Sequence, residues 1–172
     1  MPHYYKLGSI PHKRHVQFRK PDGNLYAEQL FSTEGFSDDY SLLYHCYPPT
    51  QIIKTEPQLD VSPKIAEEKM LKHRCFEGFH VKPAKDFLES RIPVLVNNDC
   101  HIVLAAPQKS MVDYFYKNSD ADEMIFVHEG KGVLKTIYGE LNFGYGDYLV
   151  IPRGTIYQIH FNESNNRLFI VE

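Results

Sequence analysis

The stretch Gly-Asp-Tyr-Leu-Val-Ile-Pro-Arg-Gly-Thr-Ile-Tyr, residues 146–157, decides the fold of this chain. A short apolar segment lies at its centre, with turn residues on both sides. Gly146 and Gly154, together with Gly144 just before them, permit the backbone angles that tight strand junctions require. Pro152 ends the segment, because proline has no N–H to donate to a strand ladder. The stretch therefore predicts a strand, a sharp turn and a second strand.

Short apolar segments separated by turn residues fill the second half of the chain. The predicted strands lie at residues 94–96, 101–105, 111–116, 123–127, 133–137, 140–143, 148–151, 156–161 and 168–171. Many short strands with regular turn signals are typical of a β-sandwich or β-barrel. The expected fold class is therefore mainly β, with a barrel core over residues 93–172.

The first half of the chain, residues 1–92, is expected to form an extension packed on this core. It contains two candidate strands, at residues 25–31 and 41–47. Residues 62–73 predict one helix, because Ser62 can cap it and its acidic residues precede its basic residues. The two parts together are expected to form one compact structural unit.

Composition and charge limit the classes of function. The net charge is −3, whereas nucleic-acid-binding domains usually carry strong positive fields, so no nucleic acid is expected as a partner. No apolar run approaches the roughly 20 residues that cross a bilayer, and no secretion signal is visible. Cys46, Cys75 and Cys100 have neither zinc-finger nor redox-motif spacing. Free thiols in the cytoplasm are therefore expected.

The stretch at residues 146–157 resembles the second signature of the cupin β-barrels. In that signature glycine, five residues, proline, one residue, glycine and two residues lead to a metal-binding histidine, and here Tyr157 stands in the histidine position. The first signature places two histidines and a glutamate before a glycine. Glu123 and Gly130 match that spacing, but residues 116–119, where the histidines are expected, read Tyr-Lys-Asn-Ser. The resemblance implies a cupin-like barrel or jelly roll (a double-stranded β-helix) that has lost its metal ligands.

Other histidines offer a poor replacement for the missing ones. A metal site usually needs about three protein ligands, which Glu123 alone does not supply. Side chains on a strand alternate between faces, so His128 and His160 are expected to point away from the side of Glu123 and Tyr157. A β-bulge would reverse that direction and permit a site built from Glu123, His128 and His160. We favour the reading without catalytic, cofactor-binding or metal-binding residues, in which Glu123 and Tyr157 are vestigial site positions and Tyr157 belongs to the core.

A second resemblance covers essentially the whole chain. It rests on residues 5–15, 17–23, 26–31 and 35–36, together with 120–132 and 146–157. These segments resemble the N-terminal half of the homogentisate 1,2-dioxygenase family. That family is implied to open the aromatic ring of homogentisate with O₂, giving maleylacetoacetate in tyrosine and phenylalanine catabolism.

The same resemblance implies where the chemistry of such an enzyme lies. Its Fe(II) is bound by two histidines and a glutamate in a second, C-terminal barrel, and a further histidine there acts as acid and base. Members of the family are longer than this chain, which stops at Glu172. No cofactor and no activity are therefore expected of the 172 residues alone. The expected partners are the C-terminal cupin half or other subunits of the same enzyme, in a homo-oligomer.

Two alternatives remain beside this interpretation. One is a free-standing, metal-free cupin that binds a small molecule near Glu123 and Tyr157 or serves as a structural module. The other is an independent metalloenzyme that uses His128 or His160. The first interpretation is favoured because the N-terminal segments match as well as the barrel segments, whereas a generic cupin would share only the latter.

Overall fold

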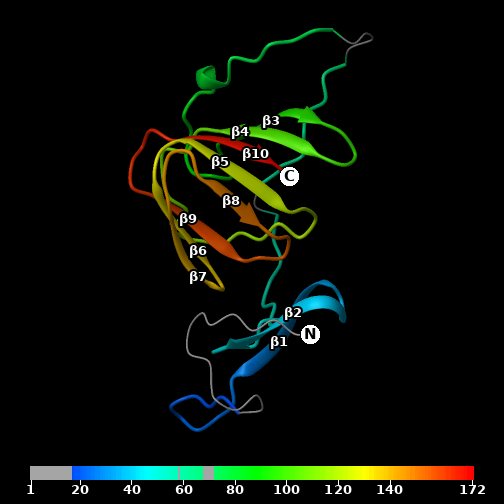
Figure 1. Ribbon diagram of the computed structural model, residues 1–172, viewed down its shortest axis with the longest axis vertical. Helices are drawn as coiled ribbons and strands as arrows, with labels where there is room; N and C mark the ends of the chain where they lie inside the picture. Colours follow the sequence, from blue (N-terminus) through cyan, green and yellow to red (C-terminus); the bar gives the residue numbers. More distant parts are fainter. Residues whose placement is uncertain (1–16, 58, 68–71) are drawn as a thin grey trace. The chain divides into compact units, whose positions relative to one another are not determined.

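The structure, a computed structural model, describes residues 17–57, 59–67 and 72–172 (Figure 1). The chain divides into two compact units, Met1–Pro57 and Gln58–Glu172. The predicted division into an extension and a barrel core at residues 92 and 93 stays a prediction.

The first unit contains an antiparallel hairpin. Strand β1 (Ala27–Glu34) pairs with β2 (Ser37–His45) along almost their whole length. Gly35 lies in the turn with a φ of +62°, a left-handed angle that glycine adopts without steric cost. Both strands predicted for this region are confirmed, although each extends closer to the turn than the sequence indicates.

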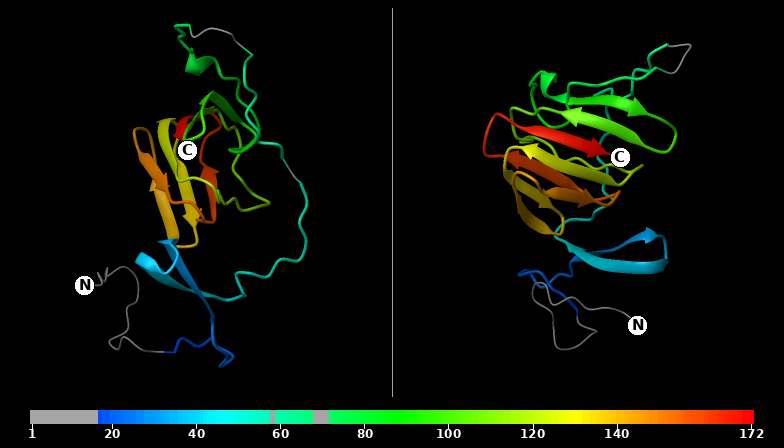
Figure 2. Two further views of the ribbon diagram at one scale, coloured as in Figure 1. Left: turned by 90° about the vertical axis from the view of Figure 1, so that its right-hand side faces the viewer. Right: turned by 45° about the horizontal axis from the view of Figure 1, so that its top comes forward.

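The second unit contains two antiparallel sheets within the described residues. Its strands are β3 (Arg91–Val96), β4 (His101–Ala105), β5 (Glu123–Glu129), β6 (Gly132–Thr136), β7 (Gly139–Phe143), β8 (Tyr148–Ile151), β9 (Tyr157–Phe161) and β10 (Arg167–Val171). One sheet has the order β3-β4-β10-β5-β8 and the other the order β7-β6-β9. Figure 2 shows β10, in red, between green β4 and yellow β5. The last strand of the chain thus lies in the middle of the larger sheet.

The hydrophobic core draws side chains from both sheets. Ile125 and Val127 of β5 and Ile170 of β10 are buried together with Leu134 of β6 and Ile159 of β9. Burial alternates along β5, as expected for a strand with one face on a core. This alternation gives each strand an inner face, and the polar residues on that face form the site described below.

The stretch at residues 146–157 forms the predicted strand and turns. Gly146 and Gly154 have φ angles of +87° and +81°. The N–H of Gly146 donates to the carbonyl of Val127 at 2.8 Å, which joins this turn to β5. The prediction for Gly144 is wrong: its φ is not positive, and its N–H donates instead to the carboxylate of Asp147 at 2.8 Å.

The helix predicted at residues 62–73 is absent from the described part of that segment. Residues 62–67 and 72–73 are not helical, and residues 68–71 of the predicted helix lie outside the described part of the chain. Ile65, on the expected apolar face, is 76% exposed. Short helices are marginal in water without a packed face, so capping and charge order do not suffice here.

No helix among the described residues is long and apolar enough to cross a membrane.

The predicted strand at residues 111–116 is replaced by an irregular segment along β9. Met111 and Tyr116 donate backbone N–H groups to Ile159 and Tyr157, at 3.0 and 2.9 Å, but the residues between them leave the ladder. The side-chain amide of Gln158 donates to two of their carbonyls instead. This side chain replaces the missing strand hydrogen bonds.

Candidate functional site

Two carboxylates stand opposite each other on neighbouring strands. In the antiparallel pairing of β5 with β10, Met124 lies opposite Val171, so the next pair along is Glu123 and Glu172. On the other side of β10, Glu172 exchanges backbone hydrogen bonds with His101 of β4, at 2.6 and 3.0 Å. Opposite neighbours in a sheet share a face, and like charges in such a pair destabilise it. The pair Glu123 and Glu172 therefore needs a cation.

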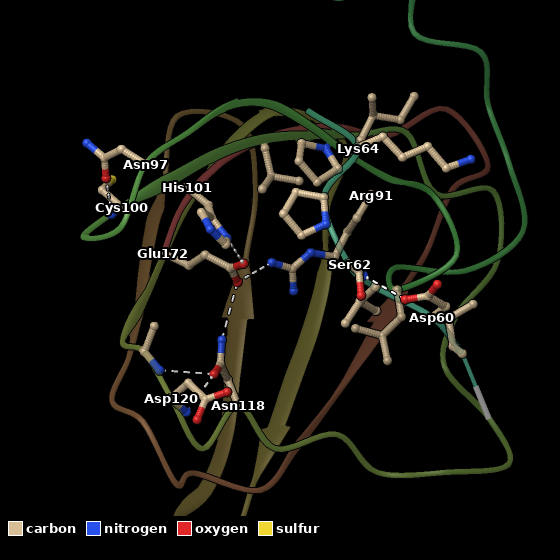
Figure 3. A pocket seen from close by; sticks show the side chains of 18 of the residues that line it. Asp60, Ser62, Lys64, Arg91, Asn97, Cys100, His101, Asn118, Asp120 and Glu172 are labelled. Atoms are coloured by element: carbon tan, nitrogen blue, oxygen red, sulfur yellow. Dashed lines mark hydrogen bonds and ion pairs between the residues drawn. The ribbon is translucent and has the colours of Figure 1, made fainter. Parts of the chain in front are cut away.

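Arg91 of β3 supplies that cation. Its Nη1 donates to Oε1 of Glu123 at 2.8 Å, and its Nη2 donates to Oε2 of Glu172. The side chains are 10% exposed for Arg91, 0% for Glu123 and 17% for Glu172, so water screens these ion pairs little. The planar guanidinium suits this role because it presents several donors in one fixed fork. Figure 3 shows Arg91 directed at the Glu172 carboxylate.

Tyr157 donates a second hydrogen bond to the Glu123 carboxylate. Its hydroxyl donates to Oε2 of Glu123 at 2.6 Å, so both oxygens of this carboxylate accept a hydrogen bond. The Tyr157 side chain is fully buried, and its ring lies 5.4 Å from that of Tyr116 and 6.3 Å from that of Phe87. The interpretation of Tyr157 as a core residue is confirmed.

Burial and charge keep protons on the phenols and the guanidinium. Burial raises the pKa of Tyr157 well above its usual value, and the charge of Glu123 acts in the same direction. Burial and the same carboxylate raise the pKa of Tyr116 to about 12. Burial lowers the pKa of Arg91, but the charges of Glu123 and Glu172 outweigh it and raise that pKa overall. These groups are therefore protonated near neutral pH.

The carboxyl group of Glu123 experiences opposing influences. Burial raises its pKa, whereas the hydrogen bond from Tyr157 and the charge of Arg91 lower it, and burial prevails. A buried carboxylate is costly unless it is paired and hydrogen-bonded. Arg91 and Tyr157 together meet that requirement.

The positions that the first cupin signature assigns to histidines contribute to the same cluster. Asn118 donates through Nδ2 to Oε2 of Glu172 at 3.2 Å. Tyr116 pairs with Tyr157 through the backbone, and Lys117 and Ser119 are exposed. Two of the four residues thus face the cluster, but neither is a strong metal ligand.

His128 and His160 lie apart from Glu123. The His128 ring packs against Phe79, with ring centroids 4.7 Å apart, and His160 Nε2 lies 2.7 Å from Oε1 of Gln158. Within residues 17–57, 59–67 and 72–172, no group of three or more His, Cys, Asp or Glu residues is placed to bind a metal ion. The structure thus does not assemble the alternative site of Glu123, His128 and His160.

A cavity of about 750 Å³ lies beside the cluster (Figure 3). Its lining includes Lys64, Arg91, His101, Tyr116, Asn118 and Glu172. Glu123 and Tyr157 do not line it, because both are enclosed in the core. The cavity has the size of a small-molecule site, but the expected pocket at Glu123 and Tyr157 is filled by the protein itself.

Comparison with known proteins identifies the family. Residues 6–172 match the family described as "Homogentisate 1,2-dioxygenase N-terminal". The chain belongs to this family. The resemblance drawn from the sequence is therefore confirmed over nearly the whole chain.

Individual relatives agree with this assignment. A protein of Saccharolobus solfataricus that carries the name "putative dioxygenase" is 36% identical over 172 residues, which are 100% of this chain and 44% of that protein. A homogentisate 1,2-dioxygenase of Dictyostelium discoideum is 27% identical over 180 residues, covering 96% of this chain and 41% of that enzyme. The chain thus spans less than half the length of these curated relatives.

One of the solved structures that resemble part of this chain is a cupin. A cupin-2 domain protein from Shewanella frigidimarina matches with a TM-score of 0.42 and 22% identity, covering 48% of this chain and 78% of that protein. The mainly-β fold class predicted from the sequence is confirmed by the strands and antiparallel sheets of the structure itself.

The iron that the family implies does not fit the residues of this barrel. Glu123 occupies the position of a cupin metal ligand, but Arg91 binds one of its oxygens and Tyr157 the other. A second positive charge beside the guanidinium would be repelled. No step of a reaction is therefore assigned to an iron ion at Glu123.

Proposed function

We propose that this chain is the N-terminal, metal-free cupin portion of a homogentisate 1,2-dioxygenase-like enzyme. Such an enzyme cleaves the aromatic ring of homogentisate with O₂ to give maleylacetoacetate, in the catabolism of tyrosine and phenylalanine. One observation carries the proposal: the family match extends over residues 6–172, yet the chain accounts for only 44% of its Saccharolobus relative. The remaining length of such relatives leaves room for a second barrel.

In this proposal the Fe(II) site belongs to the C-terminal portion, and the chain described here is inactive alone. The cluster around Glu123 supports that division, because Arg91 and Tyr157 occupy both carboxylate oxygens. The contribution of this chain is then structural. It provides a folded barrel against which the catalytic portion and neighbouring subunits are arranged in the cytoplasm.

An exposed aromatic patch on the second unit supports the expectation of a protein partner. The patch consists of Phe79, Tyr145, Tyr148 and Val150, which are 56%, 78%, 62% and 69% exposed. The His128 ring lies 4.7 Å from that of Phe79 and 6.4 Å from that of Tyr145, and the Phe126 ring lies between those of His128 and Tyr148. Exposed apolar patches often mark interaction surfaces. We infer that the C-terminal portion or another subunit of a homo-oligomer covers it.

Iron content and O₂ uptake test the proposal directly. The purified 172-residue chain is loaded with Fe(II), desalted, and assayed with homogentisate, alone and together with the C-terminal portion of a family member. The expected result is no retained iron and no O₂ uptake by the chain alone, with both appearing only when the C-terminal portion is present. Stoichiometric iron on the chain alone that disappears in Glu123→Gln, but not in the surface variant Glu163→Gln, would overturn the proposal.

The cavity beside Arg91 favours a second candidate, a free-standing barrel that binds a small polar molecule. Its walls offer both hydrogen-bond donors and acceptors in His101, Asn118 and Glu172. A thermal-shift screen with small metabolites tests it, with His101→Ala as the variant that should lose the response. If no compound raises the melting temperature, this candidate is abandoned.

A further inference from the structure

One row of residues across the inner face of the larger sheet contains two carboxylates. The register places His101, Glu172 and Glu123 in one row across β4, β10 and β5. Tyr157, Tyr116 and Asn118 face this row, and none of them carries a positive charge. The only positive charge bonded to both carboxylates in the described structure is the guanidinium of Arg91.

The sequence position of Glu123 gives this arrangement a meaning. It is the glutamate of the first cupin signature, and Tyr157 stands at the histidine of the second. We propose that the Arg91 guanidinium is the resident cation of this barrel and occupies the place that a metal ion would otherwise take between the carboxylates of Glu123 and Glu172. In this proposal the two carboxylates still pair with a cation, and this cation is a guanidinium group instead of a metal ion. This inference does not depend on the reaction of the longer relatives.

The position of Arg91 makes the proposal testable by chemical rescue. Arg91 lines the cavity, so shortening its side chain connects the vacated space with the cavity. In Arg91→Ala the two carboxylates face each other without the guanidinium between them, although His101 Nδ1 still lies 3.2 Å from Oε1 of Glu172. A small cation of matching shape can then enter from the cavity and bind between them, which defines a binding site for guanidinium-type cations.

The experiment measures the unfolding equilibrium of the 172-residue chain by urea titration at constant ionic strength. Methylguanidinium is added at about 10–50 mM, well below the molar concentrations at which guanidinium unfolds proteins. A ligand that binds only the folded state at ten times its Kd raises the folding equilibrium constant about tenfold. We expect such an increase in Arg91→Ala and none in the unsubstituted chain.

Two controls distinguish a charged, shaped site from general effects. Methylurea, which is neutral and similar in shape, should not rescue Arg91→Ala. Arg167→Ala removes another arginine of the same sheet, whose Nη1 donates to the Val81 carbonyl at 3.0 Å, and should not respond to methylguanidinium. Equal rescue by methylurea, or equal rescue of Arg167→Ala, would overturn the proposal.

A second pair of variants keeps the test decisive if Arg91→Ala does not fold. Arg91→Lys retains the charge, whereas Arg91→Gln is neutral and retains an N–H donor group beside an amide oxygen. The proposal expects the lysine variant to be the more stable, and equal stability of the two overturns it. A final arm titrates Mn²⁺: tight binding to the unsubstituted chain that is lost in Glu123→Gln would show that a metal ion, and not Arg91, occupies the site.

Discussion

The hydrogen bond between Tyr157 and Glu123 gives a sharp test of the cluster. Tyr157→Phe removes one hydroxyl and keeps the ring among Phe87 and Tyr116. The bond is 2.6 Å long, within the range of O–H donors bonded to carboxylates, and its acceptor is buried. Hydrogen bonds to charged groups contribute about 1.5–3 kcal/mol to stability. We therefore expect the free energy of unfolding to fall by about that amount.

Urea titration followed by circular dichroism measures this change, and thermal unfolding checks it. A loss of 1 kcal/mol lowers the melting temperature of a chain of this size by about 2–4 °C, so a decrease of roughly 3–12 °C is expected. Tyr148→Phe is the matched control, because Tyr148 is 62% exposed and surface changes usually stay within about 0.5 kcal/mol.

A double-mutant cycle with Glu123→Gln assigns the effect to the pair. If the hydroxyl acts through the carboxylate, the loss on Tyr157→Phe must be smaller when residue 123 is already neutral. The reasoning is refuted if Tyr157→Phe lies within about 0.5 kcal/mol of the unsubstituted chain. It is also refuted if the loss is the same in both backgrounds, because the carboxylate then plays no part.

Three other measurements test separate parts of the structure. The pKa of Tyr116 is raised to about 12, above the value near 10 of an unfolded tyrosine, so the folded state binds more protons between these values. The free energy of unfolding should therefore fall as pH rises from about 10 to 12. Urea titrations across this range should show a shallower fall in Tyr116→Phe, and an identical fall would contradict the shift. A Cβ on Gly130 (φ +110°) would lie 2.1 Å from Oδ1 of the buried Asn166, whereas a Cβ on Gly139 (φ +132°) meets no atom within 4 Å. Gly139→Ala should therefore cost only backbone strain of about 1–3 kcal/mol, and Gly130→Ala clearly more in the same chemical-denaturation assay; equal losses would refute the contact with Asn166. Gln158→Leu should cost about 1–3 kcal/mol, because two backbone carbonyls lose the amide that donates to them, and an unchanged urea midpoint would show that water replaces it.

The strands could be predicted from the sequence because their signals are local. Apolar alternation and turn residues lie within a few positions of each strand, and for β4 and β8 the predicted bounds, 101–105 and 148–151, are those of the structure. The strand prediction for residues 111–116 is wrong for a nonlocal reason. The amide that replaces its ladder belongs to Gln158, more than forty residues along the chain.

The predicted helix failed because local preference was its only support. The charges and the cap of residues 62–73 favour a helix, but the described part of that segment buries no apolar face. Such a helix gains little from packing, and packing provides most of the stability of helices in proteins.

The candidate site was predicted in part. Signature spacing located Glu123 and Tyr157, which the structure brings into direct contact. Arg91, His101 and Glu172 carry no such signal, because only the order and register of the strands place them beside Glu123. Once the strand order is known, the pairing of Glu123 with Glu172 follows by counting, and it calls for a cation.

The covalent attachment of the Arg91 cation affects how stability responds to the surroundings. A bound metal stabilises a protein in proportion to the logarithm of its free concentration, so chelation or scarcity weakens the fold. A cation on the same chain has a fixed effective concentration instead. The ion pairs of Arg91 with Glu123 and Glu172 therefore contribute equally in metal-rich and metal-poor conditions. In any polypeptide that also carries an iron site, the stability that these ion pairs give the barrel does not depend on whether iron is bound.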